Sequence, residues 1–356
     1  MTEVRSGLEG VVAFASQIAE PDRDGGALRY RGVDIEELAG RVPFEQVWCL
    51  LVDDALEPGL AAVEPHELPV RTGNTRADVQ AAVATLAGEP LIDCSDAQAR
   101  EDLARVSALT LDFAAQSARG ADLAAVPPPA SGTAAERFLT RWRGEADPRH
   151  AKAIDAYWVS AAEHGMNAST FTARVVASTG ADVAAALSAA IGALSGPLHG
   201  GAPSRVLKML DEVERCGDAA AWVARALDSG ERLMGFGHRV YRAEDPRSRV
   251  LRRTARELGS ARYAVAEALE AAALEALRAR KPDRVLATNV EFWSAVVLDF
   301  AAVPPGLFTP LFACARTAGW SAHVLEQKLD ARLIRPSALY TGPGPRSITV
   351  AARPST

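Results

Sequence analysis

The sequence predicts an all-α fold, in which helices form almost the whole chain and a minor β-hairpin lies near the N-terminus. Three observations predict it. Apolar residues recur at helical spacing after residue 32, capping signals repeat at the starts of these segments, and alternation with period two is almost absent. The exception is Val11 to Ile18 with Ala27 to Arg31, which flank the turn-forming sequence PDRDGG at 21–26 and predict a hairpin.

Local signals set the limits of several helices. Ser95 and Gln98 have the spacing of a capping box, which predicts a long amphipathic helix to about Arg119. Three more helices are expected to start where a capping residue precedes a proline, at Asp147-Pro148, Asp245-Pro246 and Thr309-Pro310. Glycines that follow periodic segments are expected to end helices at Gly165, Gly217, Gly230 and Gly259. The apolar stretch Val183 to Leu194 is about half the roughly 20 residues that span a bilayer, so it predicts a buried core helix.

Composition excludes several classes of protein. The chain has 356 residues, 48% of them hydrophobic and 24% charged, which is typical of a globular protein with a large core. A formal charge of −6 argues against general attraction to nucleic acid. The four cysteines, Cys49, Cys94, Cys216 and Cys314, form no CxxC pair and are expected to be buried free thiols. With no leader pattern at the N-terminus, we expect a cytoplasmic protein.

Glycine- and proline-rich breaks at 195–203 and 303–306 enclose about a hundred residues of helical pattern. We therefore expect residues 1–203 and 309–356 to form a large domain and residues 204–308 a small domain inserted into it. A small-molecule site is expected in the cleft between them, and closure of the small domain over the ligand is a further expectation.

Histidine and arginine carry the first functional signal. His164, His199 and His238 are three of only six histidines, and each lies beside glycine, which lets ligands approach the backbone. Between residues 232 and 256, eight arginines stand against two acids. Such a run is usually a solvated helix face. Because it follows a histidine loop, and because Arg247 would be the second residue of a helix, a carboxylate or phosphate ligand is the better interpretation.

Several motifs together resemble the citrate synthase family. They are GLEGVVAF at 7–14, LRYRGVDIEELA at 28–39, GPLHGG at 196–201, MGFGHRVYRAEDPRSRVLR at 234–252, NVEFW at 289–293, FACARTAGWSAH at 312–323 and RPSALYTGP at 335–343. GFGHRVY followed by DPR is the most specific of them. The resemblance is to the short actinobacterial form without an extra N-terminal β-domain. It implies the citrate synthase-like two-domain helical fold and no direct regulation by NADH.

The resemblance also implies an acyltransferase that condenses acetyl-CoA with oxaloacetate through an enol and citryl-CoA. By motif position, Glu291 would remove a proton from the thioester methyl group, and His199 would donate a hydrogen bond to the thioester oxygen. His238 would protonate the ketone oxygen of oxaloacetate. Its carboxylates would bind Arg247, Arg316 and Arg335, since arginine forks match carboxylates. His164 would be a further ligand. Arg335 would come from the partner subunit of a homodimer.

The family pattern suggests that CoA lies against the glycine-rich segment that begins at Met234. The candidate CoA contacts are Gly235, Gly237, Arg239 and Arg242. No metal or cofactor is implied, and acetyl-CoA is a substrate.

One departure from the family is Glu291, where the usual residue is aspartate. The longer side chain adds about 1.5 Å, so we expect the backbone to reposition slightly. Pro203, where many relatives have asparagine, is a second departure.

Three alternatives stay open at this stage. The first is a 2-methylcitrate synthase, because propionyl-CoA differs from acetyl-CoA by one methylene group, which is worth only about 1–3 kcal/mol in discrimination. The second is a zinc hydrolase that uses His164, His199 and His238. The third is a non-catalytic CoA-binding protein.

Other aromatic and histidine residues receive structural interpretations. His323 is expected to pack or to support the helix that carries Arg316, and His66 and His150 are expected at the surface. The aromatic residues Phe292, Trp293, Phe312 and Trp320 follow helical spacing and are expected in the core.

Overall fold

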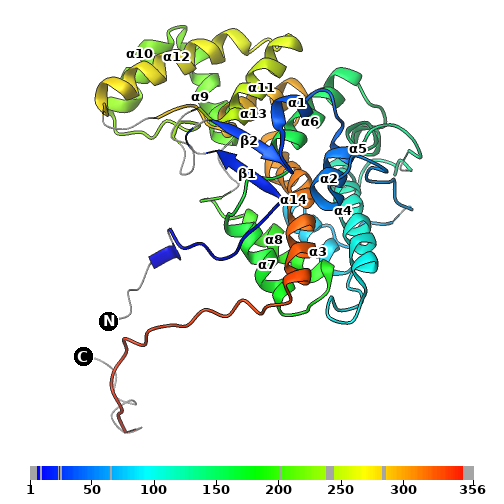
Figure 1. Ribbon diagram of the computed structural model, residues 1–356. Helices are drawn as coiled ribbons and strands as arrows, with labels where there is room; N and C mark the ends of the chain where they lie inside the picture. Colours follow the sequence, from blue (N-terminus) through cyan, green and yellow to red (C-terminus); the bar gives the residue numbers. More distant parts are fainter. Residues whose placement is uncertain are drawn as a thin grey trace.

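A computed structural model describes residues 6–8, 10–22, 24, 26–64, 66–127, 129–199, 203–237, 244–282 and 286–347. The described part is predominantly helical, as predicted (Figure 1). Its α-helices are α1 (Ile35–Leu38), α2 (Phe44–Asp53), α3 (Thr75–Ala84), α4 (Asp96–Arg119), α5 (Ala134–Arg143), α6 (Pro148–Ala161), α7 (Ala168–Ser178), α8 (Val183–Leu194), α9 (Pro203–Cys216), α10 (Ala219–Asp228), α11 (Pro246–Glu257), α12 (Tyr263–Arg280), α13 (Val290–Phe300) and α14 (Phe308–Asp330).

A three-stranded antiparallel sheet replaces the expected two-stranded hairpin. Its strands are β1 (Ala19–Asp22), β2 (Ala27–Tyr30) and β3 (Val33–Asp34), in the order β1-β2-β3. The second strand of the prediction is confirmed, but the first is wrong, because Val11 to Ile18 is not a strand. Val12 is 87% exposed, so the apolar alternation there is not buried against a core. The edge position of β1 explains how it accommodates Pro21.

Most predicted helix limits are confirmed. Ser95 caps α4, Asp147 caps α6 and Asp245 caps α11, each by accepting a backbone N–H with its side chain. Gly217, Gly230 and Gly259 follow helix ends with positive φ, and α8 has the predicted bounds. Gly165 also has positive φ, but α6 ends earlier, with its cap at Ala162. The start of α14 differs, because the 3₁₀ turn Pro305–Leu307 leads directly into Phe308, so Thr309 lies inside the helix and is not its cap.

Helix α14 is the centre of the larger group of helices. It packs against α2, α4, α6, α7 and α8, and Figure 1 shows it passing between them. Trp320 and His323, near its middle, are almost completely buried. After α14 the chain extends away from the packed body, and Arg335 lies exposed in this segment.

A second group of helices packs largely among itself. Helices α10 and α12 contact one another, α9 contacts α10, α12 and α13, and α11 and α13 contact α6 of the larger group (Figure 1). These contacts agree with a unit formed by the middle of the chain. The division at 203/204 and 308/309 stays a prediction.

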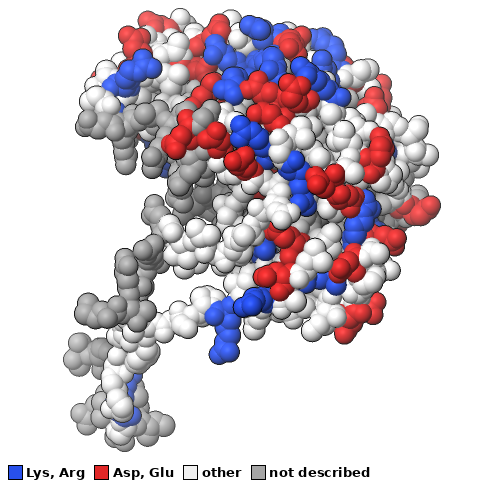
Figure 2. All heavy atoms as spheres, in the orientation of Figure 1, with Lys and Arg blue, Asp and Glu red and all other residues white. Residues whose placement is uncertain are grey.

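The described arginines of the run differ in their surroundings. Arg249 pairs with Glu36 and Glu244, and Arg252 pairs with Glu267 and Glu270, so these arginines belong to a mixed charged surface. Figure 2 shows acidic and basic side chains interspersed over the visible face. Arg247 is buried, whereas Arg249 and Arg252 are only partly buried. The anion-binding role of Arg247 stays a prediction, whereas Arg249 and Arg252 pair with carboxylates at the surface.

Three of the four cysteines are buried, whereas Cys216 is exposed. Cys216 follows the last buried positions of α9, where the helix reaches its C-terminus. No helix of the described chain has the length and apolar character needed to cross a membrane.

Candidate active site

Glu291 is the second residue of α13, and the local sequence fixes the start of this helix. Asn289 caps α13 by accepting the Glu291 N–H at 3.0 Å. The Asn289 amide also donates to the Gly237 carbonyl at 3.0 Å. The helix that carries Glu291 is thereby tied to the glycine-rich segment that begins at Met234.

Asp245 and Arg247 link the start of α11 to the start of α13. Arg247 donates two hydrogen bonds to Asp245, Nε to Oδ1 at 2.9 Å and Nη2 to Oδ2 at 2.8 Å. Asp245 also accepts the Val290 N–H at 2.9 Å. Both side chains are buried. This arrangement holds the Arg247 guanidinium in a fixed orientation, as a carboxylate-binding fork requires.

Glu291 and Arg247 line one small pocket, together with Tyr157, Ala161, Val290, Ser294 and Phe312. Burial raises the pKa of Glu291 to about 7, and the nearby Arg247 opposes the rise. A carboxyl group with a pKa near neutrality is suited to general base catalysis, because about half of it is ionised at neutral pH and the ionised form is more basic than an ordinary carboxylate.

Arg316 reaches the same region from α14. Its Nε donates to the Ala161 carbonyl at 2.9 Å, and its guanidinium carbon lies 4.8 Å from the centre of the Phe312 ring. Arg316 is 2% exposed. Arg316 thus lies over the Phe312 ring, and Arg247 lines the same pocket as Phe312, which the sequence interpretation placed in the core.

His199 lies on the turn after α8 and is held by Ser169 of α7. The Ser169 N–H donates to His199 Nε2 at 3.3 Å, and the Ser169 hydroxyl lies 2.9 Å from the same nitrogen. A backbone N–H can only donate, so Nε2 must accept, and the proton of the neutral imidazole is on Nδ1. Burial and the nearby Arg316 lower the pKa of His199 to about 4, which keeps the ring neutral. His199 is therefore a neutral hydrogen-bond donor, and its ring lies edge-on 6.4 Å from Phe312.

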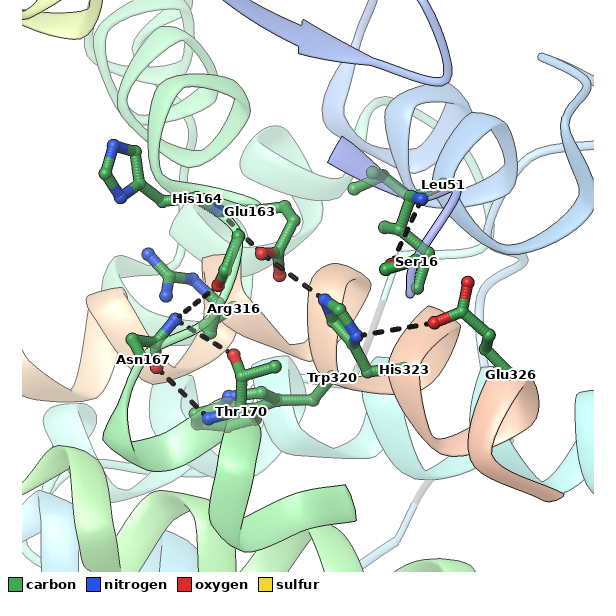
Figure 3. A network of polar contacts seen from close by, with 12 residues as sticks. Ser16, Leu51, Glu163, His164, Asn167, Thr170, Arg316, Trp320, His323 and Glu326 are labelled. Atoms are coloured by element: carbon green, nitrogen blue, oxygen red, sulfur yellow. Dashed lines mark hydrogen bonds and ion pairs between the residues drawn. The ribbon is translucent and has the colours of Figure 1, made fainter. Parts of the chain in front are cut away.

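His164 lies between α6 and α7, in the segment that contacts α14. Its backbone N–H donates to Glu163 Oε1 at 2.8 Å, and Figure 3 shows Glu163 directed toward His323. The imidazole of His164 is mostly buried. The neighbouring Asn167 caps α7 by accepting the Thr170 N–H.

The remaining predicted residues have different outcomes. His238, Arg239 and Arg242 lie outside the described residues. Gly235 has φ 85°, and a Cβ there would lie 2.8 Å from Phe292 Cβ, so only glycine fits. Gly237 also has positive φ, and its N–H donates to the Ala287 carbonyl.

Several residues of the site were missed by sequence reasoning. Tyr157, Ser169 and Glu163 come from buried helix faces or from a helix end, where they look like ordinary packing residues. Only Glu163, next to His164, carried a local signal, because a carboxylate in an apolar context needs a partner. Among the residues that the structure describes, no three His, Cys, Asp or Glu side chains gather as a metal site would require.

Comparison with known proteins agrees with this geometry. The family model for the citrate synthase C-terminal domain matches residues 7–337. A Mycobacterium tuberculosis protein named "Putative citrate synthase 2" is 65% identical over 96% of this chain and 94% of its own length. The citrate synthase of Haloferax volcanii is 38% identical, with 96% of each chain covered.

Solved structures give the same result. One is a ternary complex of Thermoplasma acidophilum citrate synthase with carboxymethyl coenzyme A and oxaloacetate. It is 27% identical with a TM-score of 0.84, and the match covers 99% of this chain and 100% of that chain. Citrate synthase from Pyrobaculum aerophilum has a TM-score of 0.81 and 32% identity, and the match covers 98% of this chain and 95% of that chain. The sequence motifs, the helical fold and these matches together show that the chain belongs to the citrate synthase family, a family of acyltransferase enzymes.

Proposed function

We propose that this protein is a citrate synthase that condenses acetyl-CoA with oxaloacetate and water to give citrate and CoA. The observation that carries the proposal is the pocket in which Glu291, with a pKa of about 7, lies beside the guanidinium of Arg247. A base next to a carboxylate-binding group is what an enol-forming condensation with a keto dicarboxylate needs.

In the proposed reaction, Glu291 takes a proton from the thioester methyl group while His199 donates its Nδ1–H to the thioester oxygen. The neutral state of His199 supports this role, since a donor aimed at the developing enolate stabilises it. The enol carbon then attacks the ketone carbon of oxaloacetate, whose oxygen takes a proton from His238. Arg247, Arg316 and His164 bind oxaloacetate. Water hydrolyses the citryl-CoA thioester, which releases citrate and CoA.

The CoA site is proposed beside the glycine-rich segment. Phe236 pairs with Thr288 as an isolated bridge. A larger cavity of about 590 Å³ lies next to this bridge, lined by Leu286, Ala287 and Thr288 together with residues of α11 and α12. The space is sufficient for the adenine end of CoA. Gly235 and Gly237 would approach CoA by their backbone, and contacts from Arg239 and Arg242 stay predictions.

The choice of citrate over 2-methylcitrate is a finer proposal. Curated relatives from several organisms carry the name citrate synthase, and the pocket beside Glu291 is small. Initial rates with acetyl-CoA and propionyl-CoA on oxaloacetate test this choice. A higher kcat/KM with propionyl-CoA would assign the protein to 2-methylcitrate synthesis.

We also propose a cytoplasmic homodimer in which Arg335 completes the site of the partner subunit. The exposed position of Arg335, on a segment that extends from the body, supports this arrangement. Mixing Arg335→Ala subunits with Glu291→Gln subunits would restore activity in the mixed dimers, since each then has one intact site. No recovery of activity after verified subunit exchange would contradict the arrangement.

A thiol assay tests the proposed function against its alternatives. Release of free CoA from acetyl-CoA only when oxaloacetate is present identifies the condensation. A non-catalytic CoA-binding protein would release none, and a zinc hydrolase would lose its activity with a chelator.

A further inference from the structure

The carboxylate of Glu163 is completely buried behind the proposed oxaloacetate site. It joins the end of α6 to α14 and precedes His164 in sequence. Its Oε1 accepts the His164 backbone N–H at 2.8 Å and lies 3.5 Å from His323 Nε2. Figure 3 shows Glu163 between His164 and His323, with Arg316 on the neighbouring part of α14.

His323 is oriented toward Glu163 by an arginine on its other side. Arg174 Nη1 lies 3.1 Å from His323 Nδ1, and because a guanidinium only donates, Nδ1 must accept. The neutral imidazole then carries its proton on Nε2, the nitrogen nearest to Glu163. Arg174 is itself fixed by Gln327 and Glu326. The result is a buried line of polar contacts from Arg174 to the backbone of His164. Its middle link, His323 Nε2 to Glu163 Oε1 at 3.5 Å, is an electrostatic contact and not a hydrogen bond.

The Glu163 carboxylate also interacts electrostatically with the guanidinium group of Arg316. Burial alone would raise the pKa of Glu163, but the His323 imidazole, the Arg316 guanidinium and the His164 N–H hold that pKa below its usual value. The approach to α14 is also tight. A Cβ at Gly319 would overlap the Glu163 carboxylate and the Ala162 carbonyl, so glycine is required there.

We propose that Glu163 is a positioning residue for oxaloacetate binding, which acts through the backbone of His164 and through the charge of Arg316. His323 contacts the Glu163 carboxylate on the side away from His164. This inference rests on the proposed function, because it assigns the orientation of two proposed oxaloacetate ligands to one buried carboxylate.

A purely structural role does not explain this location. Two charged groups taken out of water stabilise a fold weakly compared with well-packed apolar side chains, whereas removal of one partner leaves the other charge uncompensated. Here the group that would lose a nearby negative charge is Arg316, one of the proposed ligands. A neutral amide at position 163 could keep one oxygen toward the His164 N–H and His323 Nε2, but it would remove the negative charge that strengthens these contacts and faces Arg316.

The test compares Glu163→Gln and His323→Gln with a matched control. Asp155→Asn is the control. Asp155 is a partly buried carboxyl that accepts one backbone N–H, that of Phe44 at 2.9 Å, and this contact lies at the start of α2. Calorimetry measures the Kd for oxaloacetate, and steady-state rates give kcat and both KM values. Circular dichroism confirms that each variant is folded.

We expect Glu163→Gln to raise the Kd and the KM for oxaloacetate about tenfold, the size expected when a hydrogen bond to a charged group becomes one to a neutral group. The KM for acetyl-CoA should not change. His323→Gln should raise the same two constants by a smaller factor, and the double variant should be no worse than Glu163→Gln alone. Asp155→Asn should leave all of them unchanged.

Unchanged or tighter oxaloacetate binding by folded Glu163→Gln would overturn the inference, since loss of the negative charge without misplacement favours an anion. If Glu163→Gln does not fold, His323→Gln decides, and an unchanged Kd would overturn the inference. An equal loss of affinity in Asp155→Asn would also overturn it. Failure of the unmodified protein to bind oxaloacetate would instead contradict the proposed function.

Discussion

Replacement of Glu291 by glutamine is expected to separate activity from stability. The carboxylate is the proposed base, so Glu291→Gln should lower the condensation rate by roughly 10²–10⁴-fold. The same change should stabilise the protein at pH 8. Because burial raises the pKa of Glu291 from 4.5 to about 7, the folded state binds this proton more tightly than the unfolded state does.

The sign and size of the effect follow from that shift. In the unmodified protein, the contribution of Glu291 to the stability of the folded state is fully present below pH 4.5 and is lost as the pH rises through 7. A shift of this size corresponds to at most about 3 kcal/mol, and partial exposure of Glu291 reduces it. Glu291→Gln should therefore unfold at higher urea concentration than the unmodified protein at pH 8, and the difference should shrink toward pH 4.5.

The pH profile of the unmodified enzyme tests the same pKa. At pH 6 about one-tenth of Glu291 is ionised, so kcat/KM should be about tenfold lower than at pH 8. A carboxyl group with its ordinary pKa would give nearly equal values at these two pH values. Equal values, together with a Glu291→Gln variant that keeps its rate and gains no stability at pH 8, would refute the assignment of Glu291 as the base.

Three further outcomes are expected. His199→Ala should lower kcat by roughly 10²–10³-fold, because the donor to the thioester oxygen is lost. Ser169→Ala keeps the backbone N–H that fixes the His199 tautomer, so it should lower kcat by less than about tenfold. Equal losses for the two variants in steady-state assays would contradict this view. Arg316→Lys should raise the KM for oxaloacetate by about 10–100-fold with little change in the KM for acetyl-CoA, because an ammonium group cannot replace the guanidinium fork, and an unchanged value would argue against Arg316 as a ligand. Gly319→Ala should destabilise the protein by about 1–3 kcal/mol in urea unfolding, since its Cβ overlaps the Glu163 carboxylate, and unaltered stability would show that α14 can shift at no cost.

The sequence predicted those parts of the fold that depend on local chemistry. Helix starts at Asp147 and Asp245 were predictable, because the capping side chain and the proline act within a few residues. The start of α2 was not, since Pro43 offers no side-chain cap and the carboxyl group that accepts the Phe44 N–H belongs to Asp155 in α6. The strand at Val11 to Ile18 was wrong for a related reason, because alternation alone does not show whether a segment has a core to pack against.

The candidate site shows the same division. Glu291, Arg247 and His199 lie in glycine- or proline-marked motifs, and Glu291 and Arg247 line one pocket. Ser169 and Glu163 act by contacts with residues 30 and 160 positions away, His199 and His323 respectively. Such contacts are set by helix packing and leave no spacing in the sequence. Phe312 also followed core spacing, yet it faces Arg316 and the pocket of Glu291.

The central claim is that the pocket of Glu291 and Arg247 joins the acyl group of acetyl-CoA to oxaloacetate. The most direct measurement mixes the purified protein with acetyl-CoA, follows free thiol, and identifies the second product by mass spectrometry, with and without oxaloacetate. The account predicts that thiol and citrate appear in equal amounts and only when oxaloacetate is present. Thiol release that is independent of oxaloacetate, or no release from folded protein that binds both substrates, would contradict it.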